Sequence, residues 1–546
     1  MPKILIKEFD KTKSGTPSTA DNYTVLVAGL RGRTPNDNDE IKPDSNDVYE
    51  FTSADDFKNT VGLSIQYGDS ANAAYCYGGQ MAYELLKMGY PVIYLPVDKA
   101  SDLADESKWE IFKDKVNYDF RFITHGLLSS SLSDSTDYNN LTNRLAEVKS
   151  AIAVLEEIKV AYPDDEDATP DIKTELLDAR TEALQAILGD DTVSYPGLFD
   201  SETKLAYTDY DTAVEKTEAE KNSLEASITT IESNQITEGL INRANGCIAN
   251  LAMYKANTDG TVADNSGRGD CIALIELDEN SYNSSTTKPE KAIANAIDRM
   301  SSINSDNGPY CALTVPSVVY KMSYDTSDEQ ELKIANNKKF PGAFHYLACF
   351  NNSLSQGFRE WYAAAGYTRG VASYVIDHTT VKLGEIAINE LEPRSLTSDK
   401  TSPKFACNVI ANFRGSYYLW GNRTAAKLNS DEGTTGDLTA KHFLNIRQLC
   451  TTLKKQLYVA CRRFTFDPNS DTLWVNFYNA IKPTLEAMKA DQGIRDYKIL
   501  KVYTDKKATL KAKIRIIPIE AVEDFDLEVY LEDSFGETIA VPGDIQ

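Results

Sequence analysis

The sequence predicts a multidomain protein of mixed α+β and α/β class. We expect a discontinuous α/β middle domain carrying a helical insertion, a C-terminal α+β domain, and extended β-arms at both ends. Three observations predict this architecture: strands and helices alternate on both sides of an acidic segment, that segment has helical periodicity, and two long helices precede a strand pair near the C-terminus. A chain of 546 residues is also long enough for two to four domains.

The first part of the chain reads as strand, helix, strand. The apolar run Tyr23–Ala28, ended by Gly29, and the β-branched and aromatic run Tyr90–Val97 are predicted strands. Helices are predicted over Ala54–Thr60 and Ala71–Met88. This alternation is typical of an α/β domain.

The composition changes abruptly between Asn139 and Leu240, where 23 acidic residues stand against 8 basic ones. Apolar residues recur there at intervals of three and four, which predicts helices with narrow apolar seams. Breaks at 163–167 and 189–196 indicate an antiparallel helical bundle or hairpin. So many like charges are expected to stay on the surface. Two interpretations stay open: a decoration that projects outward, or a solvated insertion without a specific role.

The α/β pattern resumes after the insertion, which therefore interrupts one domain. The predicted elements are a helix over 242–255, a buried strand over 270–277, a helix over 290–301 and a strand over 310–315. A last block contains helices over about 441–461 and 474–491, strands over 498–504 and 509–518, and a terminal strand over 525–531.

These elements suggest six segments. They are an N-terminal arm and linker (1–22), the first part of the middle domain (23–138), the acidic insertion (139–240), the second part of the middle domain (241–400), the C-terminal core domain (401–520) and a C-terminal arm (521–546).

Charge and cysteine content exclude several classes of protein. The net charge of −25 disfavours direct binding to nucleic acid or to an anionic membrane. The sequence has no run of about 18 apolar residues and no N-terminal secretory signal, so we expect folding in a cytoplasm and no membrane insertion. The eight cysteines are scattered among mostly apolar neighbours, as expected of buried, reduced thiols.

The motifs that accompany chemistry are absent. No glycine precedes a lysine, which excludes a P-loop, and neither G-x-G-x-x-G nor G-x-S-x-G occurs. None of the four histidines has metal-ligand spacing. We therefore predict no catalytic, cofactor-binding or metal site and no cofactor. An α/β hydrolase-like enzyme with an unrecognised site stays open as an alternative, and it would require a deep pocket with perturbed titrating groups.

The second half of the chain resembles the tail-sheath family of contractile phages, which is similar to the sheaths of type VI secretion and related injection machines. The resemblance rests on short patterns that occur in family order: Arg268-Gly269-Asp270-Cys271-Ile272-Ala273-Leu274, Trp361 with Ala363-Ala364-Ala365-Gly366, Trp420-Gly421-Asn422-Arg423-Thr424, Phe466-Asp467-Pro468-Asn469, Trp474, Gly493 and Ile516-Ile517-Pro518. Each pattern alone is weak evidence for the family, whereas the order of the patterns over about 240–520 is more specific to it. Ala364 stands where the family has Pro, and the insertion has no counterpart in the family core.

The resemblance implies a structural protein, not an enzyme. Such a chain polymerises into a helical sheath of stacked rings around a tail tube protein, together with baseplate and tail terminator proteins. Contraction drives the tube through the target envelope and delivers the genome. We expect a virion tail protein assembled in the host bacterial cytoplasm. The sheath of a type VI secretion or extracellular injection machine, and a ring-forming baseplate component, are the alternatives.

In sheath families the chain ends link neighbouring subunits. The resemblance therefore implies inter-subunit arms formed by the apolar residues of the two terminal strands, with 11–22 as a tether: Ile4, Leu5, Ile6, Phe525, Leu527, Val529 and Tyr530. The alternative is that both strands pair within their own subunit. The family's C-terminal domain lines the tube, and the basic pairs Lys454-Lys455 and Arg462-Arg463 are the predicted tube-facing residues.

Overall fold

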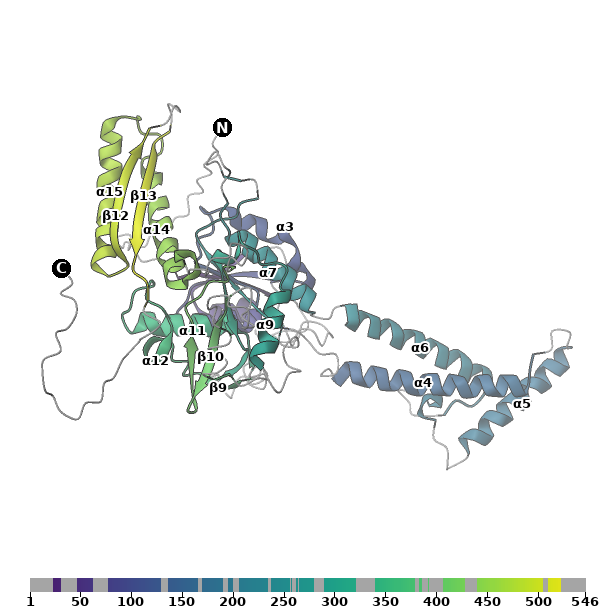
Figure 1. Ribbon diagram of the computed structural model, residues 1–546. Coiled ribbons are helices and arrows are strands. Elements are labelled where there is room, and N and C mark those ends of the chain that lie inside the picture. The colour runs from purple at the N-terminus through teal and green to yellow at the C-terminus, as the bar shows by residue number, and fades with distance from the viewer. Residues whose placement is uncertain are drawn as a thin grey trace, which may run out of the picture.

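The chain folds into an α/β body, a smaller C-terminal unit beside it, and a long helical insertion (Figure 1). The structure is a computed structural model. It describes residues 23–30, 47–61, 77–128, 136–164, 169–189, 195–199, 206–233, 237–255, 257, 262–263, 265–278, 289–320, 339–378, 383–384, 391, 406–427, 439–503 and 509–521. Among these residues no helix is long and apolar enough to cross a membrane.

The body is built on an eight-stranded sheet of mostly parallel strands. The strands follow in the order β11 (Ser416–Trp420), β10 (Asn408–Phe413), β6 (Cys311–Val315), β5 (Ile272–Ile275), β4 (Phe122–Thr124), β1 (Val25–Leu30), β3 (Val92–Val97) and β2 (Tyr49–Phe51). Only the two edge strands, β2 and β11, run antiparallel to their neighbours. The predicted α/β class is thus confirmed, and the insertion does interrupt this sheet in sequence.

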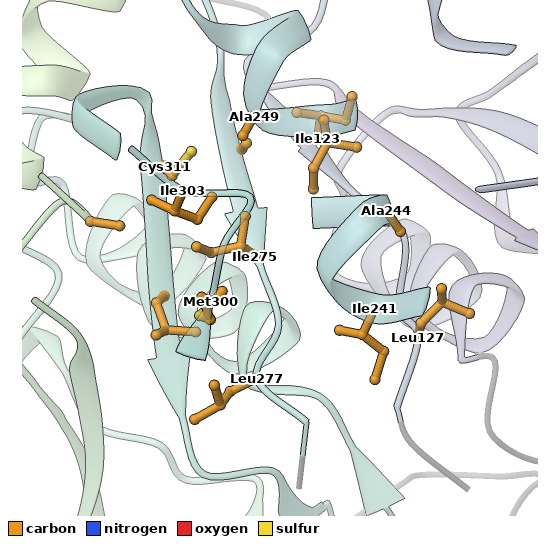
Figure 2. Close-up of a cluster of buried hydrophobic side chains, with 14 of the residues drawn as sticks. Ile123, Leu127, Ile241, Ala244, Ala249, Ile275, Leu277, Met300, Ile303 and Cys311 are labelled. Carbon is orange, nitrogen blue, oxygen red and sulfur yellow. The ribbon is translucent and has the colours of Figure 1, made fainter. Parts of the chain in front are cut away.

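Helices cover both faces of the sheet, so its central strands are apolar on both sides. One face packs against α1 (Ala54–Thr60), α2 (Gly78–Lys87) and α11 (Gly342–Ser355). The other packs against α3 (Glu106–Trp109), α7 (Glu238–Ala252) and α9 (Pro289–Arg299). Figure 2 shows part of this second cluster, with Ile241 and Ala244 of α7 near Leu127.

Two helices begin earlier than their hydrophobic pattern predicts, because capping residues extend them. Thr237 accepts a hydrogen bond from the Leu240 backbone N–H, so α7 begins at Glu238 rather than at 242. Ser470 does the same for Leu473, so α15 (Asp471–Ala490) begins before Trp474. The expected insertion boundary at 240 therefore falls inside the first turn of a body helix.

The strands after the expected boundary at 401 continue the main sheet. β10 pairs in parallel with β6, and β11 pairs with β10. A small second sheet of β7 (Val318–Tyr320), β8 (Lys339–Phe340) and β9 (Val375–His378) accompanies the body. Its strands are too short to give a periodic signal in the sequence. The division into six domains stays a prediction.

The insertion consists of α4 (Thr136–Ala161), α5 (Pro170–Leu188) and α6 (Tyr210–Ser233), as its periodicity predicts. It extends away from the body, with α4 and α6 side by side (Figure 1). A small apolar core including Leu155, Leu184 and Tyr210 joins the three helices. Arg144 of α4 forms ion pairs with Glu147 and with Glu220 of α6, which ties the two long helices together.

A buried polar network joins α7 to the ends of β4 and β5. The Asn245 side chain donates to the Glu276 carbonyl (2.7 Å) and accepts from the Glu276 N–H (3.0 Å). His125 accepts from the Leu127 N–H through Nδ1, so its Nε2 carries the proton and donates to Asn245 Oδ1 (2.9 Å). Burial lowers the pKa of His125 to about 4, which keeps the imidazole neutral.

Acid should destabilise the protein through His125. The neutral ring stabilises the fold above its ordinary pKa of 6.5, and this contribution is lost as the pH falls toward the folded-state value of about 4. The shift corresponds to about 3 kcal/mol. Between pH 7 and pH 4, wild type should lose about 3 kcal/mol more unfolding free energy than His125→Gln in urea titrations.

Comparing wild type with His125→Gln isolates the contribution of His125 to the pH dependence of the unfolding free energy. Burial raises the pKa of Glu276, so its ionisation has the opposite effect on stability as the pH rises. Both proteins carry Glu276, and its contribution cancels in the difference. Parallel pH dependences for wild type and variant would contradict the assignment to His125.

Candidate assembly surface

The C-terminal unit comprises α14 (Leu444–Arg463), α15, β12 (Ile494–Val502) and β13 (Lys511–Pro518). The two strands form an antiparallel pair, and the described residues of each pair with no third strand. One face of the pair packs on both helices around an apolar core that includes Leu453, Ile481, Leu485 and Trp361. The outer edges of this two-stranded sheet are the type of edge to which a further strand can add.

The first half of α14 is held in the body by a buried polar network. The fully buried Arg121 donates to Gln448 Oε1 (2.7 Å) and to Thr452 Oγ1 (2.6 Å). Thr452 donates in turn to Glu360 Oε1 (2.8 Å), and Gln448 donates to the hydroxyl of Tyr346 (3.1 Å). A buried cation is costly unless its donors are satisfied, so these contacts fix where α14 leaves the body.

The predicted tube-facing residues Lys454 and Lys455 point into the chain. The Lys455 ammonium contacts the Asp119 carboxylate and donates to the Phe120 carbonyl (3.0 Å). The Lys454 ammonium donates to the Gly269 carbonyl (2.8 Å), and burial lowers the pKa of Lys454 to about 8. Both side chains therefore help to dock α14 onto the body. The tube-facing role of the four basic residues stays a prediction, and of the four only Arg462 and Arg463 are exposed.

Lys454 binds the Arg268-Gly269-Asp270 segment, which the sequence predicts to be a turn before a buried strand. Gly269 has φ +73° there, a conformation that favours glycine. The Arg268 guanidinium pairs with Asp270 (3.0 Å) beneath the surface and donates to the Phe112 carbonyl (2.7 Å). The tripeptide is thus a structural turn, and its arginine is not presented to a partner.

Arg462 and Arg463 lie exposed in the last turn of α14. Beside them are Tyr458, with 38% of its surface exposed, Val459 with 54% and Phe466 with 84%. We call these five residues the distal surface of α14. Exposed aromatic and basic side chains together are typical of the centre of a protein–protein contact.

The predicted arm residues Ile4, Leu5, Ile6, Phe525, Leu527, Val529 and Tyr530 lie outside the described residues. Their role in linking subunits stays a prediction.

Sequence reasoning missed Arg121 and the basic residues of β13. The signal for Arg121 was present as a lone cation between Phe120 and Phe122 at the start of a buried strand. In β13 the signal was the strict alternation of basic and apolar residues, which predicts a strand with one charged face.

The described residues include two pockets of moderate size. One open pocket of about 530 Å³ is lined mainly by residues 354–362 with Tyr23 and Asp491, and a second of about 290 Å³ lies beside Trp109 and Cys247. His125 and Glu276 line neither pocket, whereas Cys247, whose pKa burial raises to about 11, lines the second. Within the described parts of the chain, no group of three or more His, Cys, Asp or Glu residues is placed to hold a metal ion.

Five of the seven described cysteines are buried free thiols, whereas Cys461 is exposed.

Replacing Lys455 by methionine should loosen the C-terminal unit. The change removes two contacts of a buried ammonium, and we expect a loss of about 1–3 kcal/mol of unfolding free energy. Amide hydrogen exchange in α14, α15, β12 and β13 should become faster. Lys482→Met, on the exposed side of α15, is the matched control and should stay within about 0.5 kcal/mol of wild type. Equal rates of amide hydrogen exchange in the two variants would contradict the docking role of Lys455.

Comparisons with known proteins identify the fold. No family model matches the sequence, and no curated protein matches it. A chain in the cryo-EM structure of the anti-feeding prophage baseplate is 13% identical, with a TM-score of 0.50 over 97% of this chain and 99% of that one.

Two further solved structures are more distant. The helical sheath of the anti-feeding prophage in the contracted state is 13% identical with a TM-score of 0.46, over 97% of this chain and 99% of that chain. The sheath complex of the extracellular contractile injection system PVC, also contracted, is 11% identical with a TM-score of 0.44, over 98% of both chains. The resemblance to contractile tail sheaths is confirmed at the level of the fold, which this chain shares along nearly its whole length with the chain from the anti-feeding prophage baseplate structure.

Proposed function

We propose that this chain is the sheath subunit of a contractile tail, which polymerises helically around an inner tube and contracts to drive that tube into a target. The observation that carries the proposal is the fold shared with the chain from the anti-feeding prophage baseplate structure, which extends over 97% of the present chain. The order of the short sequence patterns between about 240 and 520 supports it independently.

The proposed machine is a phage tail that delivers a genome, and the alternative is a type VI secretion or extracellular injection machine. The match to the anti-feeding prophage baseplate structure and the sequence patterns are compatible with each of these machines. In either case the proposed partners are further copies of this chain, a tube protein, and baseplate and terminator proteins. The proposed location is the assembled tail, built in the bacterial cytoplasm.

We expect the energy that drives contraction to be stored in the lattice of assembled subunits. The sequence has no P-loop, so the energy is expected to be stored during assembly in an extended lattice and released as subunits make new contacts. A gain of about 1–3 kcal/mol per subunit, the size of a typical coupling energy, adds up over a long polymer. Terminal arms that stay paired with neighbouring subunits let rigid bodies rotate without leaving the lattice.

The proposed tube contact is the distal surface of α14. Its arginines are exposed, and neither takes part in an ion pair among the described residues. Exposed charge contacts are individually weak, which suits an interface that must release when the sheath contracts. The acidic insertion leaves the body on the side opposite the C-terminal unit in Figure 1, which supports an outward direction in the polymer.

The purified protein alone should form tubes. Isolated subunits are expected to fall into the low-energy contracted lattice, and negative-stain electron microscopy should show hollow tubes wide enough to enclose a second tube. A small closed ring would favour the baseplate alternative. A monodisperse monomer with hydrolytic activity would favour the enzyme.

Charge reversal on the distal surface should impair loading on the tube. We expect Arg462→Glu with Arg463→Glu to reduce co-sedimentation with pre-formed tubes about tenfold at low salt and less at high salt, because salt screens exposed charges. Lys216→Glu with Lys291→Glu carries the same change of charge at exposed sites on α6 and α9. Unchanged loading of the first variant, or equal loss in both, would contradict the proposed tube contact.

A further inference from the structure

Positive charge gathers where α14 lies against the body, although the chain as a whole carries a net charge of −25. The cations at this contact come from both sides of it, and we call them the junction cluster: Lys115, Arg268, Arg447, Lys454 and Lys455. Two carboxylates pair with members of the cluster, Asp270 with Arg268 at 3.0 Å and Asp119 with Lys455. In the part of the chain that the structure describes, the other three cations form no ion pair, so the cluster has an excess of positive charge.

Two ammonium groups of the cluster converge on one turn. Lys115 donates to the Arg268 carbonyl. Lys454, which comes from α14, donates to the carbonyl of the next residue, Gly269 (2.8 Å). A carbonyl oxygen accepts a hydrogen bond but has no net charge with which to neutralise an ammonium group. Burial, followed by the charges of Arg447 and Lys115, lowers the pKa of Lys454 to about 8, so the cations of the cluster act on one another.

The Arg447 guanidinium is the member of the cluster with the most unused donors. Its central carbon lies 4.2 Å from the centre of the Tyr310 ring, and the Lys454 ammonium lies 5.4 Å from the same centre. The Arg447 Nε is buried, and no hydrogen bond joins the guanidinium to any described residue. A guanidinium stacked on an aromatic ring keeps its N–H groups in its own plane, where they can donate to an oxyanion.

The junction cluster is partly open to solvent beside Tyr254. This tyrosine is 41% exposed, and the centre of its ring lies 5.5 Å from the Lys454 ammonium. Lys115, Arg447 and Lys454 are half-buried, so a small ion can reach them from the surface. Water screens the charge of half-buried groups less than that of exposed groups, which strengthens the attraction of these cations for an anion.

The chemistry of the unpaired cations favours a multivalent oxyanion. Positive charge that is partly removed from water is costly unless an opposite charge accompanies it. A phosphate group carries more than one negative charge, accepts several hydrogen bonds and matches the planar donors of a guanidinium. A monovalent ion such as chloride would leave most of the excess charge in place.

We propose that the junction cluster binds an oxyanion of the phosphate class, held by Arg447, Lys454 and Lys115, and that the bound ion fastens α14 to the body. The proposal does not depend on the sheath function, because it concerns a contact within one chain. The cations come from both sides of that contact, so the ion binds best when α14 is docked. By linkage, its binding opposes undocking of the C-terminal unit.

Equilibrium dialysis of the full-length chain against radiolabelled pyrophosphate tests the site, because it measures binding to monomers and polymers alike. At pH 7 and constant ionic strength we expect the binding to saturate at one ion per chain. Arg447→Gln with Lys454→Gln should lower the affinity at least about tenfold, since two charge-assisted contacts are lost. Lys216→Gln with Lys291→Gln removes the same charge at exposed sites on α6 and α9 and should bind like wild type. No saturable binding to wild type, or equal affinities of the two variants, would overturn the proposal.

A single substitution keeps the test valid if the double variant folds poorly. Arg447→Gln removes no hydrogen bond to a described residue, so it should fold like wild type by circular dichroism and still bind more weakly. Arg447→Lys keeps the charge but loses the planar set of donors, and its affinity should lie between those of wild type and Arg447→Gln. Wild-type affinity of Arg447→Gln would contradict the site.

Amide hydrogen exchange of wild type locates the bound ion. At a pyrophosphate concentration about ten times Kd, exchange that requires undocking of α14 should slow about tenfold in α14, α15, β12 and β13, because the ion opposes undocking by a factor of 1 + [L]/Kd. Exchange in α5 of the insertion, which lies far from the junction in Figure 1, should be unchanged. Equal slowing in α5 and α14, or no slowing in α14, would rule out an ion bound at the junction.

Competing anions identify the source of the recognised group. Inorganic phosphate and ATP should each displace pyrophosphate. Tighter binding of ATP than of pyrophosphate would support a phosphate carried on a larger molecule, and equal binding would support recognition of the phosphate groups alone. Equal displacement by sodium acetate or sodium chloride at the same ionic strength would overturn the assignment to the phosphate class.

Discussion

The buried guanidinium of Arg121 is the constraint on which the arrangement of the two main parts depends. It lies immediately before β4 of the main sheet and donates to Gln448 and Thr452 of α14. A charge removed from water requires its hydrogen bonds to be made, so alternative positions of α14 are penalised. The apolar core of the C-terminal unit could slide without such a penalty. The polar network therefore determines the direction in which that unit leaves the body.

Much of the fold could be predicted from the sequence because its elements have clear apolar patterns. The strands at Val25–Leu30 and Val92–Val97 and the helix at Ala54–Thr60 lie where the pattern places them. The errors have one local and one long-range cause. Hydrogen bonds from capping residues extend helices past their apolar stripe, and the assignment of β10 to the main sheet depends on pairing with β6, about a hundred residues earlier, which no local pattern records.

The candidate surface was predicted only in part, for a related reason. The two basic pairs of α14 look alike in sequence but differ in burial. Lys454 and Lys455 donate to carbonyl groups of the body. Arg462 and Arg463 lie on the part of α14 that extends beyond the body, and they are exposed. The difference arises from where the helix is docked. Tertiary contacts made by Arg121 and Gln448 determine that point, and they join residues more than three hundred positions apart.

The position of the insertion has a practical consequence. The chain leaves the body after β4 and returns at α7, and the strand order of the sheet does not depend on what lies between. The end of α4 and the start of α5 are far from the body in Figure 1. A foreign domain fused between them would be carried at a distance from the lattice contacts proposed above. In the proposed sheath, the segment between α4 and α5 would then display an enzyme or label at one copy per subunit.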